Sequence, residues 1–477
     1  MERYDIVIVG AGTAGMPCAI EAVATGARVL VVEAEPQVGG TLHVSLGQMS
    51  GAGSELQRAH GIADSAEAHL ADIERINRGT GRREILEVTL PRQGATIDWL
   101  MENGFDMDPA CPAILHLHEA YREARTYWGV EGGVSVLKVT RPLFEAAMTR
   151  PNAELRLSTR ATGLRIEDGR VRGLTLEGPE GASEVRTGAV VLATGGYGGN
   201  AKLFARMTGG RALYTAAMPG SDGSGIEMAE AAGAGLRGQD LFLPTYAGIP
   251  HEAGGNRIVW RQMPSLTPQV RQPWELHLAT DGARFVREDD PSVDNREHAL
   301  NGLSDMAFWC VFDDAVLAEA PPLLPGWTEE ELSEAWARRD DFVSAPDIAT
   351  LAARTGMDPS ILGQSLCTYN RAVADGGPDR MGRTHLPRAI RGPGLRAIRM
   401  RGMVLKTPAG IDVDETLTVR RADGTPIEGL HAVGEAIGGS TLSGRGFISG
   451  MSVTPALTLG RWLGQRLGVA AMETTAE

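Results

Sequence analysis

The stretch YDIVIVGAGTAG (residues 4–15) decides the fold of this chain. Its first half is short, apolar and rich in β-branched residues, which is typical of a buried parallel strand. Its second half has the glycine spacing G-x-G-x-x-G and leads into a helical stretch over residues 16–25, which Gly26 ends. A second apolar strand follows at residues 28–32. We therefore predict a β-α-β unit in a parallel sheet.

The glycine-rich turn is expected to hold a pyrophosphate. Glycines let a phosphate approach the helix N-terminus, where unpaired N–H groups and the helix dipole favour an anion. Glu33, at the end of the second strand, is placed to accept a hydrogen bond from a ribose 2′-hydroxyl. A tight turn without a ligand is the alternative, but strand, helix and acid together favour a dinucleotide.

Two later strands also end in glycine-rich turns. Residues 189–193 run into Thr194 and Gly195, and residues 429–433 run into Gly434 and Glu435. In an open α/β sheet, ligands bind at the carboxyl ends of the strands. A ligand that contacts all three ends must be long, and a dinucleotide fits.

The middle of the chain has a different character. Residues 155–157, 162–166 and 170–176 predict a small antiparallel β-region. Residues 244–398 hold fewer buried-strand patterns and more Pro, Trp and charge, with helices expected at 329–339 and 347–374. We interpret this segment as an inserted capping domain. The predicted domains are therefore 1–243 and 399–477, which form one discontinuous α/β domain, and 244–398 between them.

Composition excludes several classes of partner. The chain has 477 residues and a net charge of −14, so we expect no nucleic-acid partner, because such a partner needs a basic surface. No run of about 20 apolar residues is present, and we expect no membrane span. The first residues lack a secretory signal, which makes the cytoplasm the expected location. Four widely spaced cysteines and the histidines lack ligand spacing, so we expect no metal.

Further motifs join the first one. They are GGTLHVSLGQM (39–49), RTYWGVEGG (125–133), ATGGYGGN (193–200), GSDGSGIEMAEAAGA (220–234), GARFVRE (282–288) and GFISGMSVTPALTLGR (446–461). Together they resemble the flavoprotein subunits of fumarate reductase and succinate dehydrogenase, and the related ketosteroid dehydrogenases. The resemblance implies FAD, a Rossmann-like FAD-binding domain and an inserted α+β capping domain.

The resemblance also assigns residues to FAD. They are glycine-rich turns, the acid after the second strand, and the start of the last helix: Gly10, Gly12, Ala14, Gly15, Glu33, Ala34, Gly40, Thr41, Gly47, Gln48, Ala161, Thr194, Gly195, Asp222, Gly434, Glu435, Gly450, Ser452 and Val453. A helix cap is the alternative role for Asp222. His43 lies one position away from the histidine that binds flavin covalently in membrane-bound relatives, so we expect non-covalent FAD.

The chain departs from fumarate reductases where their substrate is held. Leu317 stands near the position of the arginine that acts as the catalytic acid in fumarate reductases. Lys406 replaces a histidine that binds their substrate, and Phe447 occupies the position of a substrate-binding arginine. These losses disfavour a dicarboxylate and favour a ketone-like or cyclic substrate.

Four residues remain as predicted catalytic groups. Glu288 and Arg296 match the proton-relay positions of the fumarate reductases, with an ion pair on the surface as the alternative. Arg445 is expected to anchor the substrate from the loop beside the flavin, unless its charge is simply solvated. Tyr127 matches a ring-bearing position, and a buried core tyrosine is equally compatible with the sequence.

The sequence thus predicts an FAD-dependent oxidoreductase that acts on a CH–CH bond. It would desaturate a small molecule α,β to a carbonyl, or reduce the corresponding alkene. An ene-reductase of an unsaturated carboxylic acid is the alternative, and a flavin-fold binding protein without turnover is a second. Besides the small-molecule substrate, the reaction needs a separate electron donor or acceptor.

Overall fold

The predicted β-α-β unit is present in the computed structural model, which describes residues 2–259 and 263–476. Strand β1 (Glu2–Val9) is followed by helix α1 (Gly15–Ala24) and strand β2 (Val29–Val32). β1 pairs in parallel with β2, with Ile6 opposite Val29 and Val9 opposite Val32. All four residues of β2 are buried, as a strand covered on both faces requires.

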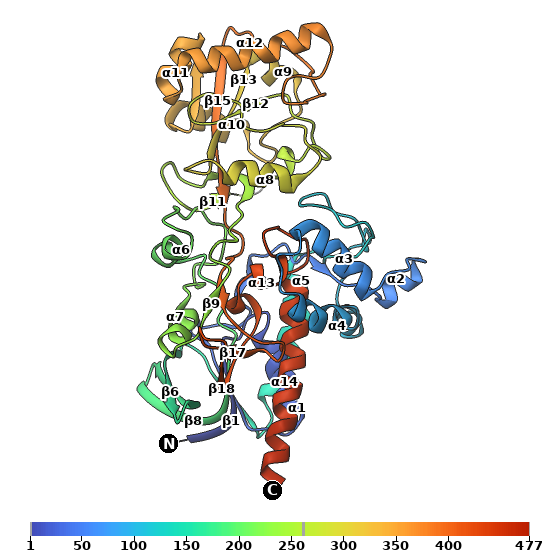
Figure 1. Cartoon of the computed structure of the whole chain (residues 1–477), viewed down its shortest axis with the longest axis vertical. Coiled ribbons are helices and arrows are strands. Elements are labelled where there is room, and N and C mark those ends of the chain that lie inside the picture. The colour runs from blue at the N-terminus through green and yellow to red at the C-terminus, as the bar shows by residue number, and fades with distance from the viewer. Residues whose placement is uncertain (1, 260–262, 477) are drawn as a thin grey trace.

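Within the described residues, the larger sheet has eight strands in the order β17-β18-β7-β8-β1-β2-β5, with β6 paired to β7. The strands not yet given are β5 (Ala153–Arg156), β6 (Arg160–Glu167), β7 (Arg170–Gly178), β8 (Gly181–Leu192), β17 (Thr418–Arg420) and β18 (Pro426–Ala432). β18 enters this sheet next to β8 although about half the chain separates them, so both ends of the chain build one domain (Figure 1).

One strand differs from the prediction. Residues 155–157 were expected in the antiparallel region with 162–166 and 170–176. Instead, β5 pairs in parallel with β2, with Leu155 opposite Val31, and extends the edge of the main sheet. Only β6, β7 and β8 form the antiparallel part. The turn at Leu157–Thr159 separates the two regions, and three residues of strand pattern cannot reveal their partner.

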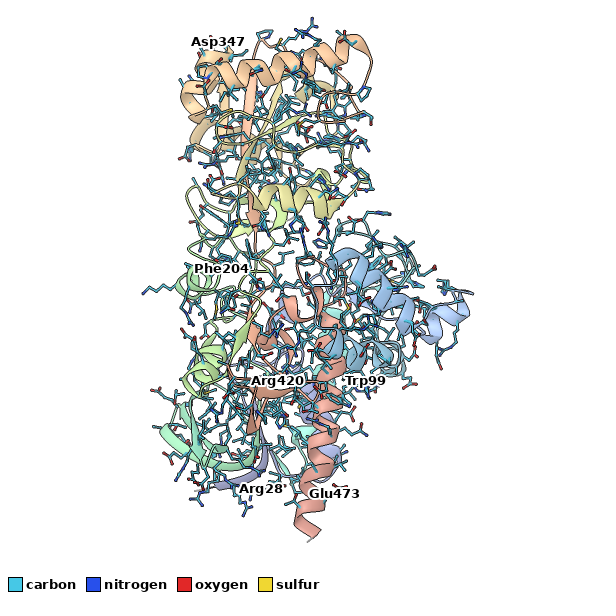
Figure 2. All side chains as sticks on the ribbon, viewed as in Figure 1. Arg28, Trp99, Phe204, Asp347, Arg420 and Glu473 are labelled. Atoms are coloured by element: carbon cyan, nitrogen blue, oxygen red, sulfur yellow. The ribbon has the colours of Figure 1, made fainter. Side chains whose placement is uncertain are left out.

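The last helix packs along the first. α14 (Val453–Ala476) packs against the shorter helix α1 (Figure 1). A Cβ at Gly460 would lie 2.3 Å from the carbonyl oxygen of Ala14, and one at Gly464 would lie 2.1 Å from that of Cys18. Glycine is therefore needed where the two backbones meet. On the other side, Trp99 lies toward α14, with the Arg461 guanidinium 4.5 Å from the centre of its ring (Figure 2).

A second, antiparallel sheet has its own core. Its order is β11-β10-β15-β13-β12, with β14 paired to β15. The strands are β10 (Thr245–Pro250), β11 (Ile258–Val259), β12 (Leu276–Leu278), β13 (Ala307–Asp313), β14 (Phe342–Ala345) and β15 (Leu395–Met403). Its helices are α8 (Val293–Asn301), α9 (Asp314–Glu319), α10 (Glu329–Arg338), α11 (Ile348–Thr355) and α12 (Pro359–Asp375). We call this unit the cap; β15 crosses the predicted boundary at residue 398.

The helix expected over 347–374 is two helices. α11 ends at Gly356, whose φ of 80° is left-handed, and α12 restarts at Pro359 with the Asp358 side chain as its N-cap. Glycine after a helix and proline at a helix start both favour such a break.

The remaining elements are short or lie around the larger sheet. They are η1 (Gly40–His43), β3 (Met49–Ser50), α2 (Glu55–Ala59), α3 (Ala66–Asn77), α4 (Arg83–Glu102), β4 (Thr126–Tyr127), α5 (Gly133–Met148), α6 (Ala201–Met207), α7 (Ser224–Ala231), β9 (Leu236–Arg237), η2 (Met263–Leu266), β16 (Gly410–Ile411), η3 (Gly434–Ile437) and α13 (Ser440–Ser443). In the described part of the chain, no helix combines the length and apolarity needed to cross a membrane.

The buried His431 of β18 makes stability depend on pH. Burial, with the nearby Arg466 charge, lowers its pKa from 6.5 to about 4. The unfolded chain therefore takes up a proton as the pH falls below about 6.5 while the folded chain does not, and stability is lost between these two values. We expect the free energy of unfolding to fall by about 2 kcal/mol between pH 7 and pH 5 through this residue. Denaturant titration of wild type and His431→Gln at both pH values measures it.

The exposed His60 supplies the matched control. His60→Gln should lose as much stability at pH 5 as wild type, and His431→Gln should lose less. Equal acid sensitivity in all three proteins would contradict the assignment.

Candidate active site

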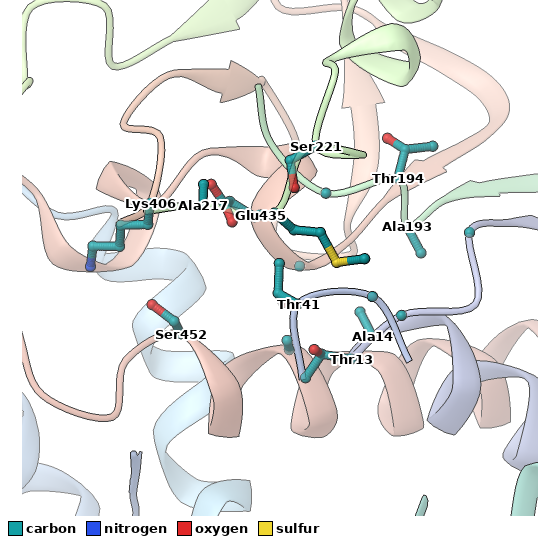
Figure 3. Close-up of a pocket in the computed structure, with 18 of the residues that line it drawn as sticks. Thr13, Ala14, Thr41, Ala193, Thr194, Ala217, Ser221, Lys406, Glu435 and Ser452 are labelled. Atoms are coloured by element: carbon teal, nitrogen blue, oxygen red, sulfur yellow. The ribbon is translucent and has the colours of Figure 1, made fainter. Parts of the chain in front are cut away.

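A cavity lies at the carboxyl ends of β1, β2, β8 and β18. Its described lining includes Val9, Val32, Ala193 and Gly434, each at or just beyond the end of one of these strands. Turns far apart in the sequence meet there: Thr13 and Ala14 lie on one side, and Thr194 and Ser221 lie across from them (Figure 3). The three glycine-rich strand ends of the sequence thus do converge.

Most residues predicted to contact FAD line this cavity. They are Gly10, Gly12, Ala14, Glu33, Ala34, Gly40, Thr41, Gln48, Ala161, Thr194, Gly195, Asp222, Gly434, Glu435, Gly450, Ser452 and Val453.

Gly15 and Gly47 are not among the described lining residues. A Cβ at Gly15 would lie 1.8 Å from the Gly10 carbonyl oxygen, and one at Gly47 would lie 2.3 Å from the Gly132 backbone. Both glycines therefore allow backbone segments to pack closely, and their contact with FAD stays a prediction.

The turn between β1 and α1 fits a pyrophosphate. No side chain caps the N-terminus of α1. The Met16 N–H donates to the Gly12 carbonyl oxygen and Pro17 has no N–H, so the Gly15 N–H is the group at the helix start that is left for an anion in the described chain. A Cβ at Gly12 would meet no atom closer than 3.9 Å, whereas Gly10 packs tightly against Ala193. The open side of Gly12 leaves room for a phosphate. Thr194 Oγ1 is buried beside the cavity without a protein hydrogen-bond partner, as expected of a group that serves a ligand.

The two acids predicted to hold the cofactor already have protein partners. Glu33 accepts hydrogen bonds from the N–H groups of Ala11, at 2.7 Å, and Glu35, at 2.9 Å. These bonds aim its carboxylate at the glycine-rich turn. Asp222 accepts from the Ser224 N–H at 2.9 Å and pairs with Arg160 at 2.7 Å. Asp222 therefore supports the start of α7 and also lines the cavity, so both of its predicted roles are compatible with the geometry.

The four predicted catalytic residues do not meet at the cavity. None of them is among its described lining residues. Tyr127 is fully buried, with its hydroxyl 2.7 Å from Ser54 Oγ and 3.1 Å from the Gly51 carbonyl oxygen. This is the core tyrosine that the sequence left open.

Glu288 and Arg296 lie inside the cap rather than on its surface. Glu288 is buried and paired with Arg284 and Arg383. Arg296 donates to the Leu266 carbonyl oxygen and lies 5.2 Å from the centre of the Tyr246 ring. No ion pair joins these two residues within the described chain, because each is held by its own neighbours.

Arg445 is directed toward the cap. Its guanidinium lies 3.1 Å from His298 Nε2 on α8. Its role as a substrate anchor stays a prediction. In the structure its guanidinium contacts His298, across the interface between the larger domain and the cap.

The cavity has another cationic residue that the sequence marked only as a replacement. Lys406 lines the cavity, donates a hydrogen bond to Ser443 Oγ at 2.7 Å and lies 4.4 Å from the centre of the Phe447 ring. Lys406 and Ser452 lie at one end of the cavity, and Thr194 lies at the other (Figure 3). Desolvation lowers the pKa of its ammonium group to about 8, although Glu435 and Glu297 oppose the shift. Lys406 can therefore change its charge near neutral pH.

Glu435 and His118 complete this end of the cavity. Burial raises the pKa of Glu435, against the hydrogen bonds that it accepts from the N–H and hydroxyl of Thr407. His118 stacks on Phe447 with 3.8 Å between ring centres and lines the cavity. Sequence reasoning did not find His118, because its loop matches no motif and its partners come from distant segments. No group of three or more metal-ligating side chains occurs in the residues that the structure describes.

Comparison with known proteins agrees with this geometry. The sequence profile of a family described as FAD binding domain matches residues 5–446. The chain is 26% identical to a fumarate reductase (cytochrome) from Shewanella frigidimarina over 97% of the chain and 77% of that protein. It is 24% identical to a 4-oxocyclohexanecarboxylate 2-dehydrogenase from Sinomonas cyclohexanicum, over 97% and 92% of the two chains.

The fold has solved counterparts. The structure of a 3-ketosteroid delta1-dehydrogenase from Sterolibacterium denitrificans superimposes with a TM-score of 0.76 at 20% identity, over 98% of this chain and all of that one. The predicted fold class, an FAD-binding α/β domain with a second domain, is confirmed.

The position of His43 bears on how FAD is held. Its Nε2 lies 3.0 Å from the Val38 carbonyl oxygen, and it is not among the described lining residues. We expect FAD to bind without a covalent bond, because the ring is held away from the cavity. Acid precipitation of the purified protein should release all flavin into the supernatant, and His43→Ala should still bind flavin. Yellow colour that stays with the precipitated polypeptide would contradict this expectation.

Proposed function

Since the chain belongs to the FAD binding domain family and is an FAD-dependent oxidoreductase, we propose that it acts on a CH–CH bond next to the carbonyl group of a ketone-like or cyclic small molecule. It would introduce a double bond α,β to the carbonyl or reduce such an alkene. When bound, FAD supplies hydride transfer to or from one of the two carbons.

The cations of the cavity carry this proposal. Among the described lining residues, the Lys and Arg side chains are Arg160 and Lys406. Arg160 is paired with Asp222 beside α7, which leaves Lys406 as the cation near Phe447. A dicarboxylate needs a cationic partner at each end, whereas a ketone has one oxygen to hold. Leu317, near the position where fumarate reductases carry an arginine, is on α9 and exposed.

Lys406 can act in catalysis, and Phe447 can help to bind the substrate. Negative charge develops on the carbonyl oxygen when a hydride adds to, or a proton leaves, the neighbouring carbons. An ammonium group at that oxygen stabilises the transition state more than the ground state, which is the condition for catalysis. The Phe447 ring, on which His118 stacks and over which the Lys406 ammonium lies, is partly exposed at the cavity and adds apolar surface for a ring-shaped substrate.

The similarity to a fumarate reductase supports an alternative, the reduction of an unsaturated carboxylic acid. Lys406 could hold one carboxylate of such a substrate. The similarity to a dehydrogenase named for an oxo-cyclohexane substrate supports the ketone instead. A binding protein without turnover is a third possibility. The intact glycine-rich turn and the Lys406 ammonium group in the same cavity give it no support.

Two further expectations belong to the proposal. Electrons would come from, or go to, a separate donor or acceptor, and the protein would act in the cytoplasm. Both rest on the sequence alone.

Single-turnover oxidation tests the substrate class. The holoenzyme is reduced with dithionite without oxygen and mixed with 2-methyl-2-cyclohexen-1-one or with fumarate, and flavin absorbance is followed. We expect the enone to reoxidise the flavin at least tenfold faster than fumarate, since one cation suffices for a ketone. Faster reoxidation by fumarate would establish the carboxylic-acid alternative, and no reoxidation by either would favour the binding protein.

Lys406 should control the rate with that enone. Lys406→Met removes the ammonium group but keeps a similar volume, and we expect a loss of about 100- to 1,000-fold. In wild type the rate should fall as the pH rises through about 8, because the ammonium group is then deprotonated. Lys406→Met should lack this falling limb.

The exposed Lys202 on α6 provides the control. Lys202→Met should match wild type in rate and in pH profile. A Lys406→Met enzyme with the wild-type rate and flavin content would remove Lys406 from the mechanism.

A further inference from the structure

A buried histidine and a buried glutamate face one another across the interface between the two domains. His118 belongs to the loop before β4, and Glu297 belongs to α8 of the cap. His118 Nδ1 lies 3.4 Å from Glu297 Oε1, and the two residues are 3% and 1% exposed. This contact does not have hydrogen-bond geometry, and neither atom has a hydrogen-bond partner within the described chain. A buried polar atom without a partner calls for an explanation, and a catalytic role is one of them.

The remaining contacts of His118 turn it toward the substrate end of the cavity. One face of its ring stacks on Phe447, the ring that Lys406 also approaches. Because Nδ1 is buried next to Glu297, Nε2 is the nitrogen left for a ligand in the cavity that His118 lines. A carboxylate next to one imidazole nitrogen can hold the ring in one orientation, so that the other nitrogen faces the ligand.

We propose that His118 is the acid–base residue of the reaction, giving a proton to the carbon next to the carbonyl during reduction and removing it during desaturation, with Glu297 as its positioning residue. This inference rests on the proposed function. It gives the proton transfer a residue that the sequence-based candidates do not supply: Glu288 and Arg296 are enclosed in the cap, and Tyr127 is enclosed in the core.

The step balances with the groups present. The β-carbon of the enone gains a hydride from the bound reduced cofactor, and the carbon–carbon π electrons move to form an enolate whose oxygen faces Lys406. The Nε2–H bond of protonated His118 then breaks and a C–H bond forms at the α-carbon. Neutral His118 regains a proton from solvent. Lys406 and His118 have separate tasks, because one acts at oxygen and the other at carbon.

The pair also depends on the cap. Glu297 reaches His118 only when α8 lies against the larger domain, where Ser292 donates to Glu119 Oε2 at 2.8 Å and Arg78 lies 3.6 Å from Asp294. Arg445 of the larger domain contacts His298 on the same helix, α8. The acid–base pair is therefore assembled by the same contacts that hold α8 against the larger domain.

The test uses dithionite-reduced holoenzyme and 2-methyl-2-cyclohexen-1-one, because protonation of its α-carbon creates a stereocentre. His118→Phe keeps the stack on Phe447 but has no proton to give. We expect it to slow flavin reoxidation by at least about 100-fold and to lower the enantiomeric excess of the 2-methylcyclohexanone formed, since water replaces the fixed donor. The exposed His116, two residues earlier, supplies the matched control: His116→Phe should equal wild type in both measurements.

Glu297 is tested by its amide and its shorter acid. Glu297→Gln should slow reoxidation by about tenfold or more, and Glu297→Asp should recover part of the loss, while both keep their flavin. A purely structural role would let the isosteric amide serve as well as the acid. This comparison also decides the matter if His118→Phe does not fold.

The outcomes separate the two proposals. Wild type that the enone does not reoxidise would overturn the proposed function and the role of His118 with it. Wild type that reacts, together with His118→Phe of unchanged rate and enantiomeric excess, would overturn only the role of His118. Slow, stereochemically relaxed His118→Phe beside a normal His116→Phe would support both.

Discussion

The structure depends on close backbone packing around the first turn. At Gly10 and Gly15 the backbone lies so near to Ala193 and to itself that no Cβ fits, and α14 approaches α1 through Gly460 and Gly464 in the same way. These contacts hold β1, β8, α1 and α14 in one rigid arrangement. The open side of Gly12 and the uncapped start of α1 then face a cavity whose walls come from both ends of the chain. A side chain at Gly10, Gly15, Gly460 or Gly464 would move the walls before it touched a ligand.

The cap adds the second half of the site. Its sheet and core are separate from those of the larger domain, and α8 brings Asp294, Glu297 and His298 toward Arg78, His118 and Arg445. The larger domain thus holds the cofactor turn and the Lys406–Phe447 pair, while the cap completes the surroundings of His118. A reaction that moves a hydride at one carbon and a proton at the next can be divided in this way between two domains.

Prediction from the sequence succeeded where local pattern and function coincide. The glycine turn, Glu33 and the two later strand ends were found because each follows an apolar strand, and most of the assigned cofactor residues do line the cavity. It was less successful with β5 and with the helix over 347–374, since short patterns do not reveal a strand's partner and a single glycine can end a helix. The acid–base residue was missed for a different reason. His118, Glu297 and Phe447 are far apart in sequence and meet only through the packing of the cap. Matching motifs by position instead selected Glu288 and Arg296, which this chain keeps as buried residues inside the cap.

The central claim is that one ammonium group, Lys406, holds the oxygen of a carbonyl substrate beside the Phe447 ring. A crystal structure of the oxidised holoenzyme with 2-methyl-2-cyclohexen-1-one tests it most directly. The account predicts the carbonyl oxygen at hydrogen-bond distance from Lys406 Nζ, about 2.7–3.2 Å, with the α-carbon on the side of His118. An enone whose oxygen is bound by Arg445, or that lies away from Phe447, would contradict the account.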